Sequence, residues 1–475
     1  MMETMTASAG GSVADASEDL GDGLLLRRAR LHDAAAVAAL LVGAHAAAAP
    51  AAGAAADLDW IGIWARDLME RPHPTMTAGD VVVVEDTGAG RLVSTLNLIP
   101  QTWAYAGVPL GVGRVELVGT DPAYQGRGLV RRQLELVHRR SAARGHLLQV
   151  ISGIPGYYHQ FGYTYALAAG GGRTAWRAHV PAPAPGAAEP FRLRLAGAAD
   201  LAALDEIEQH AAARSRLACV RDHAAWRYEL DGRSAASALH SPLLLLEAVG
   251  HDARAPRPAG EGRIVGFAVL GNGGFPGTPP AGPIARVRRF EVAPGVSWRA
   301  ATLCLLRHLT RPRCAAAPAA GPAYEEVRLA LGEDHPAYAA APGVLAQPLA
   351  GSAWYVRGPD LPALLRRVRS VLEARLAASL VAGYTGRLSL SFYRDGLRLR
   401  LERGHLAAAE AWPRAPFRAA DACFPDLTFL QLLMGYRSLD ELEDVSPDCR
   451  VSQPEARLVL NALFPKQPSA VWPIA

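Results

Sequence analysis

The sequence predicts an α/β (α+β) protein with two related halves, each a mixed sheet flanked by helices, followed by a separate α+β part. Three observations predict this organisation. Residues 115–150 read as a strand, a glycine turn, a helix and a second strand. Two stretches of the first half recur in the second half, and the last part of the chain opens with an amphipathic helix followed by a hairpin.

The bulk composition excludes several classes of protein. A chain of 475 residues has room for about three domains of ~150 residues. The net charge is only +4, from 49 basic and 45 acidic residues, so we expect no nucleic-acid partner. No stretch approaches the ~20 consecutive apolar residues that span a bilayer, so we expect no membrane association. Residues 1–23, rich in Ala, Ser and Gly, lack the apolar core of a secretory signal, and we expect a disordered tail.

The cysteines show no ligand or disulfide pattern. The five of them, Cys219, Cys304, Cys314, Cys423 and Cys449, are far apart and odd in number. We therefore expect free thiols in a reducing cytoplasm and no metal site.

Composition divides the chain into three parts. The proline-rich linker 180–190 separates the first two, because its prolines exclude regular structure. After the tail, we expect domains over residues 24–182, 183–348 and 349–475.

The first two parts begin alike. Residues 25–40 and 192–207 align without gaps, and each predicts a short strand followed by an amphipathic helix. Asp33 and Asp200 stand near the two helix starts, where a carboxylate accepts hydrogen bonds from free backbone N–H groups.

A second pair of matching stretches shows where the two halves differ. Residues 114–122 match 286–294, and both read as a strand that ends at a proline, Pro122 or Pro294. Only the first half continues with a glycine turn. This contrast indicates that the turn has a function in the first half.

The third part reads as α+β. Residues 361–379 predict a helix with one apolar face, formed by Leu364, Leu365, Val368, Val371, Leu372 and Leu376. Residues 386–402 alternate apolar and polar around an Asp-Gly pair, which predicts a hairpin. Ser438 and Glu441 have the spacing of a capping box.

The glycine turn has the chemistry of an anion cradle. We expect a helix from near Gly126 to about Arg144, with Gly145 as its C-terminal cap. The backbone N–H groups of residues 125–130 then lack partners within the helix and point outward at its positive end. Gly126 and Gly128 carry no Cβ that would hold a phosphate at a distance. The helix face toward the core is formed by Leu129, Leu134 and Val137.

The elements around this turn resemble the GNAT acetyltransferases. The turn Gln125-x-x-Gly128 follows a strand and precedes a helix, a second strand and the sequence YYHQFGY at 157–163. Val130 stands where the family has a small residue. The resemblance implies an N-acetyltransferase that uses acetyl-coenzyme A and no metal. It implies pantetheine contacts at Val118 and Thr120, and pyrophosphate contacts at Gln125, Gly126, Arg127, Gly128, Leu129 and Val130.

The layout of the whole chain resembles the Eis (enhanced intracellular survival) family. That resemblance implies tandem GNAT-like domains, of which the second is degenerate, and a C-terminal domain similar to sterol carrier proteins. It implies transfer of acetyl to a primary amine of a small, multi-amine, aminoglycoside-like substrate by direct attack, in a homo-hexamer. The alternatives are an acetyltransferase for protein or peptide lysines or for polyamines, and a non-catalytic protein that binds a hydrophobic ligand.

The resemblance also implies catalytic groups. It places a general acid at Tyr158, since a phenol near the sulfur can protonate the leaving thiolate. It places the general base at the terminal carboxylate of Ala475, and Glu116 on the strand before the turn is the internal alternative. We expect Trp60 and Trp64, four residues apart on one helix, to pack in the core.

Overall fold

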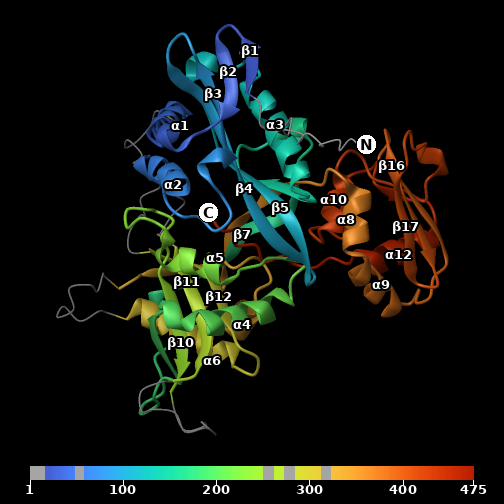
Figure 1. The fold of residues 1–475 in the computed structure, drawn as a ribbon. Helices are drawn as coiled ribbons and strands as arrows, with labels where there is room; N and C mark the ends of the chain where they lie inside the picture. The colour runs from blue at the N-terminus through green and yellow to red at the C-terminus, as the bar shows by residue number, and fades with distance from the viewer. Residues whose placement is uncertain (1–16, 49–57, 250–261, 272–283, 312–322) are drawn as a thin grey trace, which may run out of the picture.

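A computed structural model describes residues 17–48, 58–249, 262–271, 284–311 and 323–475, and these form the α/β (α+β) fold that the sequence predicts (Figure 1). The expected disordered tail needs one correction. Residues 18–21 form a strand that pairs with the next one, while residues 1–16 lie outside the described ranges.

The first half contains the strand and helix expected at 25–40 and the strand, helix and strand expected at 115–150, together with elements that the sequence did not predict. Its elements are β1 (Glu18–Gly21), β2 (Leu24–Arg28), α1 (Ala34–Ala48), α2 (Asp59–Glu70), β3 (Val81–Asp86), β4 (Arg91–Tyr105), β5 (Val108–Thr120), α3 (Leu129–Ala143), β6 (Leu148–Ile151) and β7 (Thr164–Trp176).

The elements of the second half are β8 (Phe191–Leu195), α4 (Leu201–Ala212), β9 (Leu217–Cys219), α5 (His223–Arg227), the π-helical turn η7 (Tyr228–Gly232), β10 (Leu243–Ala248), β11 (Ile264–Gly271), β12 (Ile284–Val292), α6 (Trp298–Thr310), β13 (Glu326–Leu329), α7 (Pro336–Ala340) and β14 (Gln347–Arg357). Their order is similar to that of the first half, with β9 added between the first two helices and α7 added before the last strand.

One sheet runs through both halves. Its described strands lie in the order β1-β2-β3-β4-β5-β6-β14-β7-β13-β12-β11-β10-β8, and β9 pairs with β4. The halves therefore exchange strands: β14 lies between β6 and β7, and β7 pairs with β13. In each half one parallel pair follows the helix crossover, β5 with β6 and β12 with β13.

The two halves share an ion-pair arrangement that supports a duplication. In each, an arginine on the first matched strand donates to the aspartate at the helix start and to a glutamate on the neighbouring strand. These trios are Arg27, Asp33 and Glu85, and Arg194, Asp200 and Glu247. In the gapless alignment of residues 25–40 with 192–207, Arg27 matches Arg194 and Asp33 matches Asp200.

The third part forms a second sheet, ordered β17-β16-β15-β18-β19. Its elements are α8 (Leu361–Arg367), α9 (Arg369–Ala377), β15 (Gly386–Ser391), β16 (Gly396–Glu402), β17 (His405–Ala411), β18 (Ala422–Cys423), α10 (Thr428–Leu433), α11 (Leu439–Val445), β19 (Arg450–Val451) and α12 (Pro454–Leu463). The hairpin and the capping box at Ser438 are confirmed. The single helix expected over 361–379 is wrong in one respect, because the helix breaks at Val368 (φ −95°, ψ 14°).

The division into domains at residues 182 and 348 stays a prediction. The core of the third part is continuous with the face of the large sheet, where its Leu365 and Phe429 share a cluster with Trp103 and Val150. The expected boundary at 349 falls inside β14.

No helix in the described ranges is long and apolar enough to cross a membrane. The four described cysteines, Cys219, Cys304, Cys423 and Cys449, are free and buried, and Cys314 lies outside the described residues.

Candidate active site

The glycine turn forms a cradle of free backbone N–H groups. Gly128 is the N-cap of α3 with φ 76° and ψ 10°, and Gly126 has φ 77°, so both residues adopt the left-handed conformation that suits glycine. A Cβ built on either residue would meet no protein atom within 4 Å. In the described part of the chain, the N–H groups of residues 126–131 make no hydrogen bond. The cradle is therefore open, positive and free to bind an anion.

The side chains around the cradle fit the predicted helix. Leu129, Leu134 and Val137 are buried, and Gly145 follows the helix with φ 72°, as a C-terminal cap should. Val130 is half-buried and packs partly against the core of the first half.

A cavity of about 690 Å³ adjoins the cradle. Arg127 and Arg132 line one side of it, and Asp19 and Asp22 line the other. Arg132 also contacts Glu18 of β1. β1, which the sequence did not predict, thus lines the cavity beside the anion cradle.

The strand before the cradle separates from its parallel neighbour. β5 pairs with β6 only through Val112, Gly113 and Arg114, although β5 continues to Thr120. Its pairing with β4 shifts register beyond Glu116, and Leu117 adopts φ 52°. Such a bulge bends a strand and increases its twist. The edge of β5 from Val118 to Thr120 therefore faces away from β6 and leads to the cradle.

Tyr158 lies where these two strands diverge. Its side chain is buried among the rings of Tyr157, Tyr163 and Tyr355 at centroid distances of 5.1–6.2 Å. A Cβ on Gly153, just after β6, would lie 2.9 Å from the Tyr158 ring, so only glycine allows this packing. Burial raises the pKa of Tyr158, and the charge of Glu116 raises it further, which keeps the phenol neutral.

Glu116 is buried on β5 and paired within the strand. Its Oε1 accepts from Arg114 Nε at 2.9 Å and from Ser152 Oγ at 3.4 Å. Burial raises the pKa of Glu116, and the Arg114 guanidinium opposes that shift. A carboxylate with a raised pKa and a single cationic partner has the chemistry of a general base.

The end of the chain reaches the same region (Figure 1). Gln101 Nε2 and Arg114 Nη1 both donate to the carbonyl of Ile474, at 2.6 Å and 2.9 Å. Arg233, just after η7, donates to the oxygen of Ala475 through Nε at 3.0 Å and Nη2 at 2.7 Å. Through Arg114, the last residues are thus connected to Glu116.

Several buried polar atoms near this end of the chain have no hydrogen-bond partner among the described residues. They belong to Trp60 (Nε1), Trp64 (Nε1), His73 (Nε2), Asn97 (Oδ1 and Nδ2) and Tyr228 (OH). Buried polar groups in folded proteins are paired with protein, water or a ligand. We define these five side chains as the acceptor-side cluster.

The equivalent helix start in the second half has no cradle. α6 follows Gly295 and begins at Trp298, and Ser297 caps it by accepting from Ala300 N at 3.3 Å. A side chain thus pairs with one N–H of the first turn, whereas the first half leaves its first turn free. The expected loss of the site from the second half stays a prediction.

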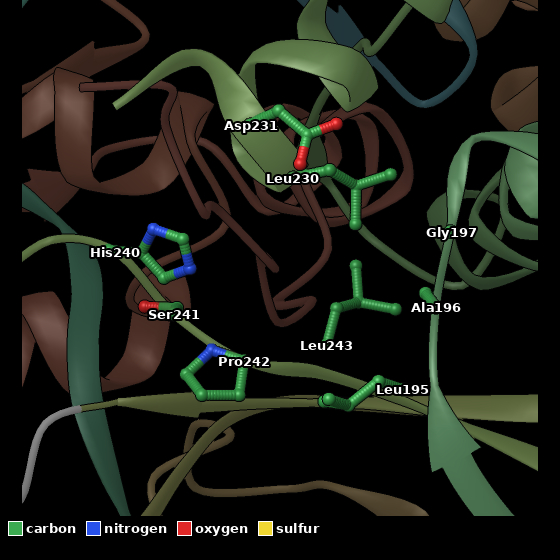
Figure 2. Close-up of a pocket in the computed structure, with 9 residues that line it drawn as sticks. All are labelled: Leu195, Ala196, Gly197, Leu230, Asp231, His240, Ser241, Pro242 and Leu243. Atoms are coloured by element: carbon green, nitrogen blue, oxygen red, sulfur yellow. The ribbon is translucent and has the colours of Figure 1, made fainter. Parts of the chain in front are cut away.

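A second cavity, of about 220 Å³, lies in the second half (Figure 2). Leu195 lines it and aligns with Arg28 of the first half, whose Nε donates to the Gly79 carbonyl at 2.9 Å. A leucine at this position cannot make that bond. None of the predicted site residues lines this cavity.

Comparison with known proteins defines the class. Residues 26–166 match the family described as Acetyltransferase (GNAT) domain. The first half of this chain is therefore a GNAT acetyltransferase domain, and the protein is an N-acetyltransferase. Members of that family use acetyl-CoA as the acetyl donor. Among the described residues, no group of three or more His, Cys, Asp or Glu side chains is arranged to hold a metal ion.

Solved structures show the same fold over the whole chain. A probable N-acyltransferase of Enterococcus faecalis V583 is 12% identical with TM-score 0.61, and the match covers 95% of this chain and 100% of that one. A GCN5-related N-acetyltransferase of Kribbella flavida is 16% identical with TM-score 0.59, covering 97% and 99%. Eis1 of Mycobacterium abscessus is 14% identical with TM-score 0.55, covering 94% and 99%. No curated protein matches the sequence.

The structure brings most of the predicted site residues together. Val118, Thr120 and the turn from Gln125 to Val130 form one continuous edge, and Tyr158 and Glu116 lie at its inner end. Sequence reasoning missed Asn97, His73, Tyr228 and the arginines at 114 and 233. These residues belong to no local motif. Asn97 and Arg114 reach the site through the pairing of β4 with β5, and the second half brings Tyr228 and Arg233 to it, with Tyr228 against His73.

Proposed function

We propose that this protein transfers acetyl from acetyl-coenzyme A to a primary amine of a small molecule by direct attack. The observation that carries this proposal is the row of free N–H groups at 126–131, next to the open edge of β5. The cradle would hold the pyrophosphate, and the edge from Val118 to Thr120 would pair with the pantetheine arm. The coenzyme supplies an activated acetyl thioester.

Tyr158 would protonate the leaving thiolate. Its buried position keeps the phenol in the protonated form, which is the form that can donate. Its hydroxyl donates to no acceptor in the described part of the chain, so no internal bond competes with that role.

Two groups are candidates for accepting the proton of the attacking amine. The terminal carboxylate of Ala475 is favoured by the resemblance to the Eis family and by the contacts that hold Ile474 at Arg114 and Ala475 at Arg233. Glu116 is the internal alternative, because its carboxyl is buried with only one strong cationic partner. A Glu116→Gln variant and a variant with an amidated last residue distinguish them, since only loss of the true base removes the acid limb of the pH–rate profile.

The experiment that tests the proposal has two stages. Calorimetry with acetyl-coenzyme A tests binding, and an acceptor screen with detection of the released thiol tests transfer. The screen includes aminoglycosides, polyamines and lysine peptides, which are the alternatives that the sequence leaves open. Absence of binding at millimolar acetyl-coenzyme A contradicts the proposal and favours a non-catalytic protein.

We also propose a homo-oligomer, a hexamer by resemblance, which light scattering after size exclusion would measure. A cytoplasmic location and the likeness of the third part to sterol carriers stay predictions.

A further inference from the structure

The acceptor-side cluster is formed mainly by aromatic rings. Trp60 and Trp64 stack with centroids 6.2 Å apart, and His73 meets Tyr228 edge to face at 4.6 Å. Burial lowers the pKa of His73 to about 4, and Arg233 contributes to that shift, so the imidazole is neutral at pH 7. Asn97 adds an amide with both of its polar atoms buried and unpartnered among the described residues.

The cluster lies beside the proposed reaction centre. Asn97 is the direct cross-strand partner of Glu116. The Arg114 guanidinium lies 6.0 Å from the Trp64 ring. Tyr228 packs against Ile474, whose carbonyl accepts from Arg114. The cluster therefore lies on the same face of the sheet as Glu116 and next to the end of the chain.

The charges around the cluster are balanced. Glu116 pairs with Arg114 at 2.9 Å, and Glu229 pairs with Arg233 at 2.7 Å. Arg221 lies 3.8 Å from Glu229 and is buried.

One further carboxylate, Asp67, accepts from Ser234 N and Oγ at 3.1 Å and 3.0 Å. The buried charged groups of α2, β5 and the segment 221–234 are thus three carboxylates and three guanidiniums. When the terminal carboxylate of Ala475 and the guanidinium of Arg288, which interacts with Glu229 and Arg233, are also counted, four carboxylates stand against four guanidiniums. No carboxylate is left over to pair with an additional ammonium.

We infer that the acceptor is a small molecule with one amine on an aromatic or apolar body, and that polycations are poor acceptors. This inference rests on the proposed transferase function and specifies its substrate class. A second ammonium would lose its hydration here without gaining a carboxylate partner, whereas apolar surface gains from burial against the rings. The unpartnered donors and acceptors of the cluster, Asn97 above all, suit one neutral polar group on the same molecule.

The test compares two acceptors that differ by one ammonium group. The ratio of kcat/KM for hexylamine to that for 1,6-diaminohexane is measured with acetyl-coenzyme A at saturation. We expect the wild-type protein to favour hexylamine by at least about tenfold, despite the two reactive ends of the diamine. Asn97→Asp adds one carboxylate without a change of shape, and we expect it to shift the ratio about tenfold toward the diamine. Asn461→Asp makes the same change on an exposed face of α12 and should leave the ratio unchanged.

The outcomes separate this inference from the function on which it rests. A wild-type protein that acetylates the diamine or kanamycin as well as hexylamine overturns the inference and leaves the transferase proposal standing. Failure to acetylate any amine, with acetyl-coenzyme A bound, overturns the proposed function and the inference with it. The wild-type ratio requires no variant, so it decides the question even when Asn97→Asp does not fold.

Discussion

The glycine cradle gives the sharpest test of the site, through the substitution Gly128→Ala. Gly128 adopts φ 76° and ψ 10°, a conformation that costs a residue with a Cβ roughly 1–2 kcal/mol. The added methyl would meet no protein atom within 4 Å, so no clash adds to this cost. We therefore expect a loss of stability of about 1–2 kcal/mol.

The effect on the coenzyme should be larger and separable. The methyl would stand in the open space at the free N–H groups of 126–131, where a phosphate would bind. A hydrogen bond to a charged group contributes roughly 1.5–3 kcal/mol, so the loss of one raises the Kd for acetyl-coenzyme A by about 10-fold to 100-fold.

Gly145→Ala is the matched control. Gly145 follows the other end of the same helix with φ 72°, and a Cβ there would also meet no atom within 4 Å. The two variants therefore have the same conformational cost, and only one of them alters the cradle. Thermal unfolding measures the shared loss of stability, and calorimetry with acetyl-coenzyme A measures the difference between the variants. Equal affinity of the two variants would refute the assignment of the cradle.

Three further predictions follow from named contacts. Tyr158→Phe should lower kcat by at least about 100-fold with little change in coenzyme Kd, as thiol release measures, and full turnover would remove the general acid. Ser297 already caps the helix start in the second half, so calorimetry should find one coenzyme per chain, and two would contradict the loss of that site. Burial lowers the pKa of His146 to about 4, below the ~6.5 of an unfolded chain, so the unfolded state binds the extra proton and stability falls as the pH drops from 6.5 to 4. Urea unfolding at several pH values measures how the free energy of unfolding changes with pH. The variant His146→Gln should lower this dependence by at most about 1 kcal/mol per pH unit between pH 4 and 6.5, and an unchanged dependence would contradict the role of His146.

Local patterns in the sequence predict the local parts of the site. The strand, the turn and the helix at 115–150 were predictable because the proline, the glycines and the apolar spacing each act within a few residues. The capping box at Ser438 and the hairpin after Gly386 were predictable for the same reason. The break at Val368 was not, because the apolar face continues across it without interruption.

The acceptor side was not predictable from the sequence. Asn97, His73 and Tyr228 are more than 20 residues apart, and the sheet and the packing of η7 bring them together. β14 was read as the start of the third part, whereas it lies between β6 and β7. Such strand exchange pairs segments that are far apart in the chain. The alternation of apolar and polar residues within one strand does not specify which other strand it pairs with.

The contrast between the two halves explains why a chain would keep a second domain that has no cradle. The second half contributes Tyr228, Glu229 and Arg233 to the acceptor side through the π-helical turn η7, a type of distortion that is frequent at functional sites. It also supplies β9, which pairs with β4 two residues beyond Gln101. Under the proposed function its fold completes the site of the first half, although Ser297 caps its own corresponding helix start. On this view the duplicated domain retains its sheet because the sheet positions η7, while the glycine turn was free to be lost.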